Sequence, residues 1–163
     1  VDQAFWGTGY IAAVSNYGLM KGYSDGTFMP DTAITRAEFA VIAARYFNIE
    51  RSNSVTSIDE HFSDIADSWA KSTIEEVYRY SIINGYSDGT FKPNSSISRA
   101  EAVTMINRML YRGPVSTDKN LFNDISASDW FYGQVMESSL SHSYTINSDA
   151  TETVSGWIED EMK

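Results

Sequence analysis

Two arginines occupy the same position of a repeated five-residue motif, where each could bind an anion. Arg36 lies in Ile-Thr-Arg-Ala-Glu at residues 34–38, and Arg99 lies in Ile-Ser-Arg-Ala-Glu at residues 97–101. A hydroxyl residue followed three positions later by glutamate is typical of a capping box at a helix start. A cation in the first turn opposes the helix macrodipole, so its repeated use there indicates an anionic ligand nearby. Pairing with a neighbouring carboxylate is the alternative, and the motif leaves both interpretations open.

The arginine motif belongs to a longer repeat with a period of 63 residues. Gly-Tyr-Ser-Asp-Gly-Thr-Phe occurs at residues 22–28 and again at residues 85–91. A fixed period over this length is typical of a repeat architecture. We expect three units, namely an N-terminally incomplete first repeat, a complete second repeat and a degenerate third repeat with an acidic tail, over residues 1–52, 53–115 and 116–163.

Each complete unit predicts two helices joined by a turn. Apolar residues at helical spacing predict a first helix over about residues 69–81, with Gly85 as its C-cap. Ser-Asp-Gly-Thr predicts a turn, because Asp and Gly tolerate left-handed backbone. The second helices, over about residues 36–47 and 99–111, are apolar enough to be buried in the middle of a bundle. The predicted fold class is therefore mostly all-α, a helical repeat bundle, and the tail after Ser141 carries no clear element.

Composition narrows the function classes. The net charge of −10 argues against sequence-independent binding of nucleic acid or of an anionic membrane. The absence of cysteine excludes thiolate metal sites and thiol nucleophiles. No apolar run of about 18 residues occurs, so we expect no membrane insertion, and no signal-peptide pattern is visible. His61 and His142 fall at non-equivalent positions of their units, so neither a metal nor another cofactor is predicted.

The combined motifs resemble those of a known family. Gly-Tyr-x-Asp-Gly-Thr-Phe-x-Pro followed by Ile-Thr-Arg-Ala-Glu, with Phe-x-Asp and Trp ahead, resembles the signature of the S-layer homology (SLH) domain. The resemblance implies a pseudo-threefold spindle of helical repeats that holds exported proteins non-covalently on the bacterial cell wall or S-layer. It also implies a ligand, a secondary cell-wall polysaccharide that often carries pyruvylated, acidic sugars.

The resemblance further implies that ligands bind in grooves between units. A guanidinium can pair with a sugar carboxylate, and an indole face can pack on a sugar ring, while aspartates accept hydroxyl protons. We expect one groove to combine Arg36 with Asp64 and Trp69, and a second to combine Arg99 with Asp124 and Trp130. Trp6 is a further candidate for a groove wall. The tryptophans as core anchors and the aspartates as N-caps are alternatives that stay open.

Two other functions are weighed against a carbohydrate-binding anchor. A glycosidase needs two carboxylates facing each other across a cleft, and the repeats supply no such asymmetric pair. The neighbouring Glu75 and Glu76 are interpreted as a solvated helix face, and no nucleophile motif occurs, so we predict no catalytic residues. A protein–protein interaction module of an exported surface protein is the alternative. The oligomeric state is left open.

Overall fold

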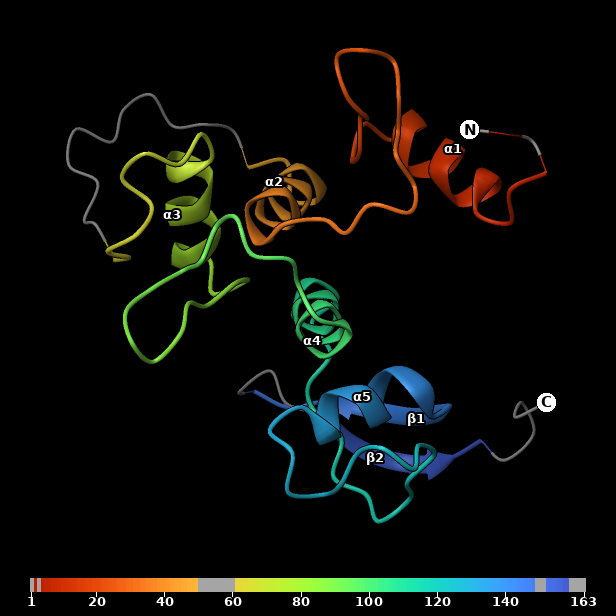
Figure 1. Ribbon diagram of the computed structural model, residues 1–163. Coiled ribbons are helices and arrows are strands. Elements are labelled where there is room, and N and C mark those ends of the chain that lie inside the picture. The colour runs from red at the N-terminus through yellow and green to blue at the C-terminus, as the bar shows by residue number, and fades with distance from the viewer. Residues whose placement is uncertain (1, 3, 50–60, 149–151, 159–163) are drawn as a thin grey trace. The chain divides into compact units, whose positions relative to one another are not determined.

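A computed structural model describes residues 2, 4–49, 61–148 and 152–158 (Figure 1). The chain divides into two compact parts, an N-terminal part over residues 1–97 and a C-terminal part over residues 98–163. The compact parts are out of phase with the sequence repeats, because the second helix of the second repeat belongs to the C-terminal part. The predicted unit boundary between residues 52 and 53 lies outside the described residues. No described helix combines the length and the apolar character that crossing a bilayer requires.

The N-terminal part contains α1 (Thr8–Asn16), α2 (Arg36–Tyr46) and α3 (Lys71–Arg79). Helix α2 packs against α3, so the second helix of one repeat is covered by the first helix of the next repeat. Small side chains on α2 allow this close approach, and the fully buried residues of the pair are Ala37, Ala40, Ala43, Ile74 and Val77. No residue of α1 is buried.

The C-terminal part contains α4 (Arg99–Met109), α5 (Tyr132–Ser139), β1 (His142–Ile146) and β2 (Glu152–Trp157). Helix α4 packs against α5, which repeats the pairing of α2 with α3. The two strands form an antiparallel hairpin beside α5, with a register shift in β1 (Figure 1). The core of the C-terminal part consists of Val115, Tyr132, Met136 and Leu140, and Val154 and Trp157 of the hairpin pack against it.

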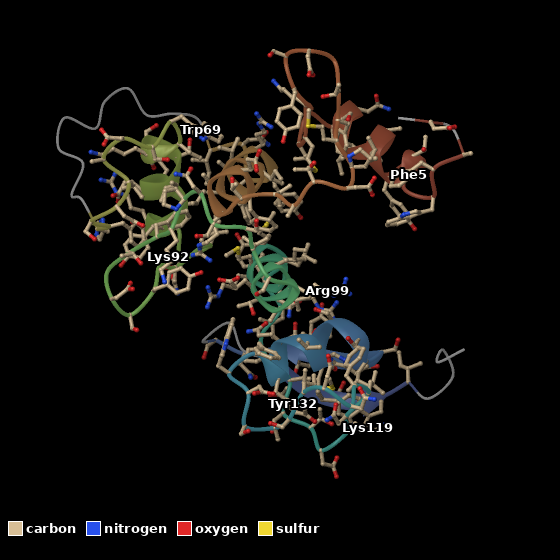
Figure 2. The ribbon with its side chains drawn as sticks, viewed as in Figure 1. Phe5, Trp69, Lys92, Arg99, Lys119 and Tyr132 are labelled. Atoms are coloured by element: carbon tan, nitrogen blue, oxygen red, sulfur yellow. The ribbon has the colours of Figure 1, made fainter. Side chains whose placement is uncertain are left out.

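The mostly helical fold class is confirmed, and the hairpin is an addition to it. Tyr132 helps to close the C-terminal core, because its hydroxyl donates a hydrogen bond to the carbonyl of Lys119 at 2.8 Å (Figure 2). The Lys119 ammonium in turn lies 4.8 Å from the ring centre of Trp157. The tail after Ser141 therefore returns to the core as strands.

Both capping boxes are confirmed. The Thr35 hydroxyl accepts the backbone N–H of Glu38 at 3.2 Å, and the Glu38 carboxylate accepts the backbone N–H of Thr35 at 2.7 Å. Ser98 and Glu101 form the same reciprocal pair at 3.2 and 2.8 Å. These bonds fix α2 and α4 to begin at their arginines.

Gly85 does not cap the first helix of its repeat, which corrects the sequence prediction. Helix α3 ends at Arg79, and the left-handed residue after it is Ser81, with φ 57°. Gly85 is instead required by crowding. A Cβ there would lie 2.6 Å from the Thr90 carbonyl oxygen and would overlap the Phe62 ring.

We expect Gly85→Ala to destabilise the N-terminal part by about 2–3 kcal/mol, because backbone and a buried ring must both move. The matched control is Gly9→Ala, since nothing lies within 4 Å of a Cβ at this exposed position of α1. That control should be neutral or should stabilise by up to about 1 kcal/mol. Urea unfolding followed by circular dichroism checks both, and a G85A variant as stable as the parent would contradict the crowding argument.

Candidate functional site

Arg36 is buried and holds a loop of the following repeat. Only 3 % of the residue is exposed, and its Nε donates to the Phe91 carbonyl at 2.7 Å. Its Nη2 donates to the Asn84 carbonyl at 2.9 Å, and the guanidinium lies 4.6 Å from the ring centre of Tyr86. The expected direct contact with a ligand does not fit this geometry, because the guanidinium is enclosed by the loop over residues 84–92.

The start of α2 is also filled by protein atoms. The backbone N–H of Arg36 donates to the Ser95 carbonyl at 2.9 Å, and that of Ala37 donates to the Pro93 carbonyl at 3.0 Å. The donors that usually make a helix N-terminus an anion site are therefore already used. The anion predicted beside this helix start is replaced by carbonyls of the next repeat.

Asp64 holds the same loop from its other side. Its Oδ1 accepts the backbone N–H of Phe91, and its Oδ2 accepts that of Lys92, both at 2.8 Å. The structure thus brings Arg36 and Asp64 together, as expected, but through the backbone at Phe91. Each carboxylate oxygen keeps a second lone pair that can accept a further proton.

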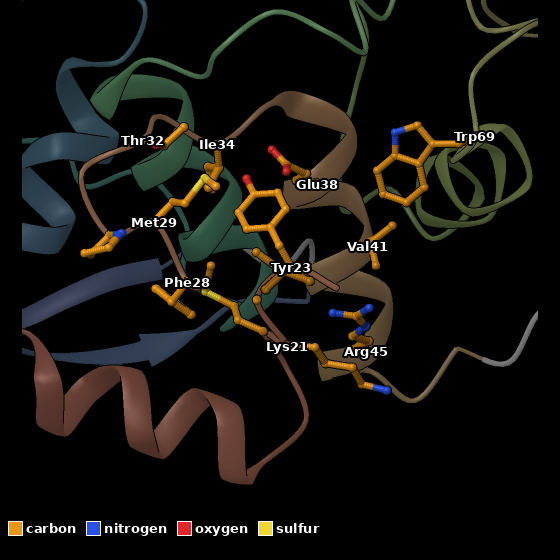
Figure 3. Close-up of a pocket in the computed structure, with 14 residues that line it drawn as sticks. Lys21, Tyr23, Phe28, Met29, Thr32, Ile34, Glu38, Val41, Arg45 and Trp69 are labelled. Carbon is orange, nitrogen blue, oxygen red and sulfur yellow. The ribbon is translucent and has the colours of Figure 1, made fainter. Parts of the chain in front are cut away.

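Trp69 lies open to solvent, with 61 % of its surface exposed. It lines a hollow of about 250 Å³ together with Lys21, Tyr23 and Arg45 (Figure 3). Lys21 is exposed, and Arg45 is half-buried with Nη1 donating to the Leu19 carbonyl at 2.9 Å. Two cations beside two aromatic rings suit an acidic, ring-shaped ligand.

Trp69 also lines a second hollow, of about 230 Å³, whose character is different. Asp64 and Asp67 contribute carboxylates to its wall, and Asn94 contributes an amide. These groups suit ligand hydroxyls and disfavour an anion. The Trp69 indole therefore stands between a basic hollow and an acidic, hydroxyl-accepting one.

Comparison with known proteins decides the family. The model of the S-layer homology domain matches residues 2–40 and 61–103, which together make up half of the chain. The chain belongs to the SLH domain family. Both matches run through a Gly-Tyr-Ser-Asp-Gly-Thr-Phe turn into an Arg-Ala-Glu helix start.

Relatives with this SLH region include proteins of the bacterial surface. "Cell surface glycoprotein 1" of Acetivibrio thermocellus is 40% identical over 151 residues, which cover 88% of this chain and 6% of that protein. The "Cellulosome-anchoring protein" of the same organism is 38% identical over 155 residues, which cover 94% of this chain and 35% of that protein. An "S-layer protein" of Bacillus licheniformis is 31% identical over 120 residues, which cover 72% of this chain and 14% of that protein. The SLH chain thus spans a minor part of each of these relatives.

The second predicted groove differs from the first. Arg99 is exposed, and its side chain forms no hydrogen bond or ion pair with the described residues. The reason is in the sequence, because the third SLH repeat lacks the loop that receives the arginine in the first pair of repeats. Asp124 is exposed, and Trp130 is 67 % exposed with its ring 5.4 Å from that of Phe131.

Trp6 lies before α1 and is 81 % exposed. Its ring contacts those of Phe5 and Tyr10, with ring centres 5.6 and 6.4 Å apart. Neither of the two hollows at Trp69 includes it. Its ligand-binding role stays a prediction, as do those of Arg99, Asp124 and Trp130.

The acidic residues of the turns and of α3 differ in their surroundings. The hydroxyls of Thr27 and Thr90 donate to Asp25 and Asp88 at 2.7 and 2.6 Å, and these bonds lower the pKa of each aspartate. Their predicted role as turn residues is confirmed. Glu75, by contrast, is buried and lies 2.9 Å from Nδ1 of His61, so its assignment to a solvated helix face is wrong.

Lys21 and Arg45 are site residues that the repeat pattern did not predict. Helix α2 was expected to be buried all round, yet Glu38, Val41 and Arg45 line the basic hollow on one stripe. The spacing of Glu38, Val41 and Arg45, at intervals of three and four residues, places them on one face of the helix and could have been recognised in the sequence. The Arg45 side chain also suits the last turn of α2, where the macrodipole favours a cation.

Proposed function

We propose that this SLH chain is a non-catalytic module that anchors an exported bacterial protein to the cell wall. Its SLH membership supports this, as do relatives named for cellulosome anchoring and for surface layers. Both also support an extracellular location at the bacterial envelope. A relative named "Endoglucanase", from a Bacillus strain, shares only 11% of its length with this chain, which fits an anchor attached to separate catalytic domains.

The observation that carries the proposal is the exposed Trp69 between its two unlike hollows. We propose that a wall polysaccharide lies across the indole, with a sugar ring packed on its face. A carboxylate of an acidic sugar, such as a pyruvate ketal, pairs with Lys21 and Arg45 in the basic hollow. Neighbouring hydroxyls donate to Asp64 in the second hollow.

Arg36 supports this site indirectly, by holding a loop that leads into its wall. Together with Asp64 it holds the loop over residues 84–92, which leads directly into Pro93 and Asn94 in the wall of the second hollow. Its contribution to binding is therefore one of position. We further propose that Arg99, Asp124 and Trp130 serve a second, weaker groove, and that the repeats form the family's pseudo-threefold spindle with both Arg-Ala-Glu helices at its centre.

Sedimentation with purified Gram-positive sacculi tests the anchor directly. We expect the chain to co-sediment with native sacculi and to stay in solution once hydrofluoric acid has removed the wall polymers. Retention on stripped sacculi would point to peptidoglycan instead. A protein–protein module predicts no sedimentation in either case, and an enzyme acting on wall sugars predicts released saccharide.

A further inference from the structure

A cluster of potential metal ligands lies in the C-terminal part, and none of its residues lines either hollow at Trp69. Glu137 of α5, His142 of β1 and Glu152 of β2 each offer one ligand atom, and these atoms lie within 4.8 Å of one another. The side chains of all three are fully shielded from solvent. Residues from three different elements therefore converge on one buried point.

The imidazole of His142 is oriented as a ligand would be. Its Nδ1 lies 2.9 Å from the Leu140 carbonyl, which can only accept, so Nδ1 carries the proton. In the neutral ring, Nε2 then presents a lone pair towards the two carboxylates. Metal-binding histidines characteristically use one ring nitrogen in this way while the other donates to a carbonyl.

The carboxylates do not satisfy Nε2 by direct hydrogen bonds. Oε2 of Glu137 lies 3.1 Å from Nε2, and Oε2 of Glu152 lies 3.5 Å from it. None of these three atoms has a hydrogen-bond partner among the described residues. Around a tetrahedral zinc ion, ligand atoms about 2.0 Å from the metal are about 3.3 Å apart. The two separations from Nε2 match that spacing.

The charges of the cluster leave one carboxylate uncompensated, which a further cation could balance. Arg112 lies 2.5 Å from Oε1 of Glu137 and balances one of the two carboxylates. Burial raises the pKa of Glu137, although Arg112 and His142 oppose that shift. The second buried carboxylate is compensated either by a proton taken up within the cluster or by a bound cation.

We propose that Glu137, His142 and Glu152 form a structural site for a divalent transition metal of the zinc class. One imidazole and two carboxylates are ligands that zinc accepts, and a water can supply the fourth position. The ion joins the hairpin to α5 and so fixes the tail of the degenerate third repeat. In this repeat the ion holds two segments together, as the Arg-Ala-Glu helix that begins at Arg36 and the loop that it contacts are held together.

The test uses the full chain, freed of any purification tag and stripped with EDTA. Titration with Zn²⁺ alone should show one ion bound per chain and a higher melting temperature. Glu152→Gln should weaken Zn²⁺ binding by at least about tenfold. Glu75→Gln is the matched control, because it alters a buried glutamate that pairs with the exposed His61, a pair that includes no second carboxylate, so it should leave Zn²⁺ binding unchanged.

A spectroscopic measurement on the unmutated chain covers the case in which E152Q does not fold. Co²⁺ added to the stripped chain should give the visible absorption of a tetrahedral site, and Zn²⁺ should displace it. The proposal is overturned if the stripped chain binds neither ion and its melting temperature does not change. If NMR then showed His142 to be an imidazolium, a proton on its ring would supply the positive charge that the proposal assigns to the metal ion.

Discussion

Replacing Arg36 with alanine is expected to destabilise the N-terminal part by about 3 kcal/mol or more, since two charge-assisted hydrogen bonds are lost inside the protein. The carbonyls of Phe91 and Asn84 are left without their donor, and the guanidinium no longer covers the Tyr86 ring. In a chain of this size such a loss corresponds to a fall in melting temperature of roughly 10 °C. Differential scanning calorimetry measures it.

Arg99→Ala is the matched control, because the residue has the same place in its repeat but is exposed. Its effect on stability should stay within about 0.5 kcal/mol. Arg36→Lys should fall between the two variants, since an ammonium keeps the charge but loses the planar fork that reaches both carbonyls. Equal melting temperatures for R36A and R99A would contradict the structural role of Arg36.

Replacing Trp69 with alanine is expected to weaken binding to wall polysaccharide by about thirtyfold, the effect of losing a central aromatic contact. Fold stability should change little, because most of the indole is exposed. Co-sedimentation with sacculi over a range of protein concentrations gives the apparent affinity.

Tyr80→Ala is the control for this experiment. Tyr80 also belongs to the N-terminal part and is 64 % exposed, but it lines neither hollow at Trp69. Its removal should leave wall binding unchanged. A similar loss of binding in W69A and Y80A would show that general surface apolarity, and not the Trp69 site, holds the polysaccharide.

The elements that the sequence predicted well depend on local contacts. A capping box joins Thr35 to Glu38, three residues away, and a turn joins Asp25 to Thr27, so both follow from spacing alone. The role of Arg36 could not be predicted in this way. Its acceptors are backbone carbonyls 48 and 55 residues further along the chain, and every residue type carries such a carbonyl.

The C-terminal hairpin left a weaker signal. His142, Tyr144 and Ile146 alternate with small polar residues, which is a strand pattern, but the segment is short and its partner strand is polar. The convergence of Glu137, His142 and Glu152 has no signature in the sequence, because their spacing is set by the packing of α5 on the hairpin. Recognition of the SLH motifs did not reveal it, since the third repeat departs from the family pattern there.

The most direct measurement is a calorimetric titration with a synthetic saccharide that carries a pyruvate ketal, beside the same saccharide without it. The account predicts saturable binding of the ketal form, at least about tenfold weaker binding of the plain form, and loss of ketal discrimination on replacing Lys21 and Arg45 with glutamine. The assigned indole N–H signal of Trp69 should shift during the titration. Equal affinity for the two saccharides, or a Trp69 signal that does not move while binding saturates, would contradict it.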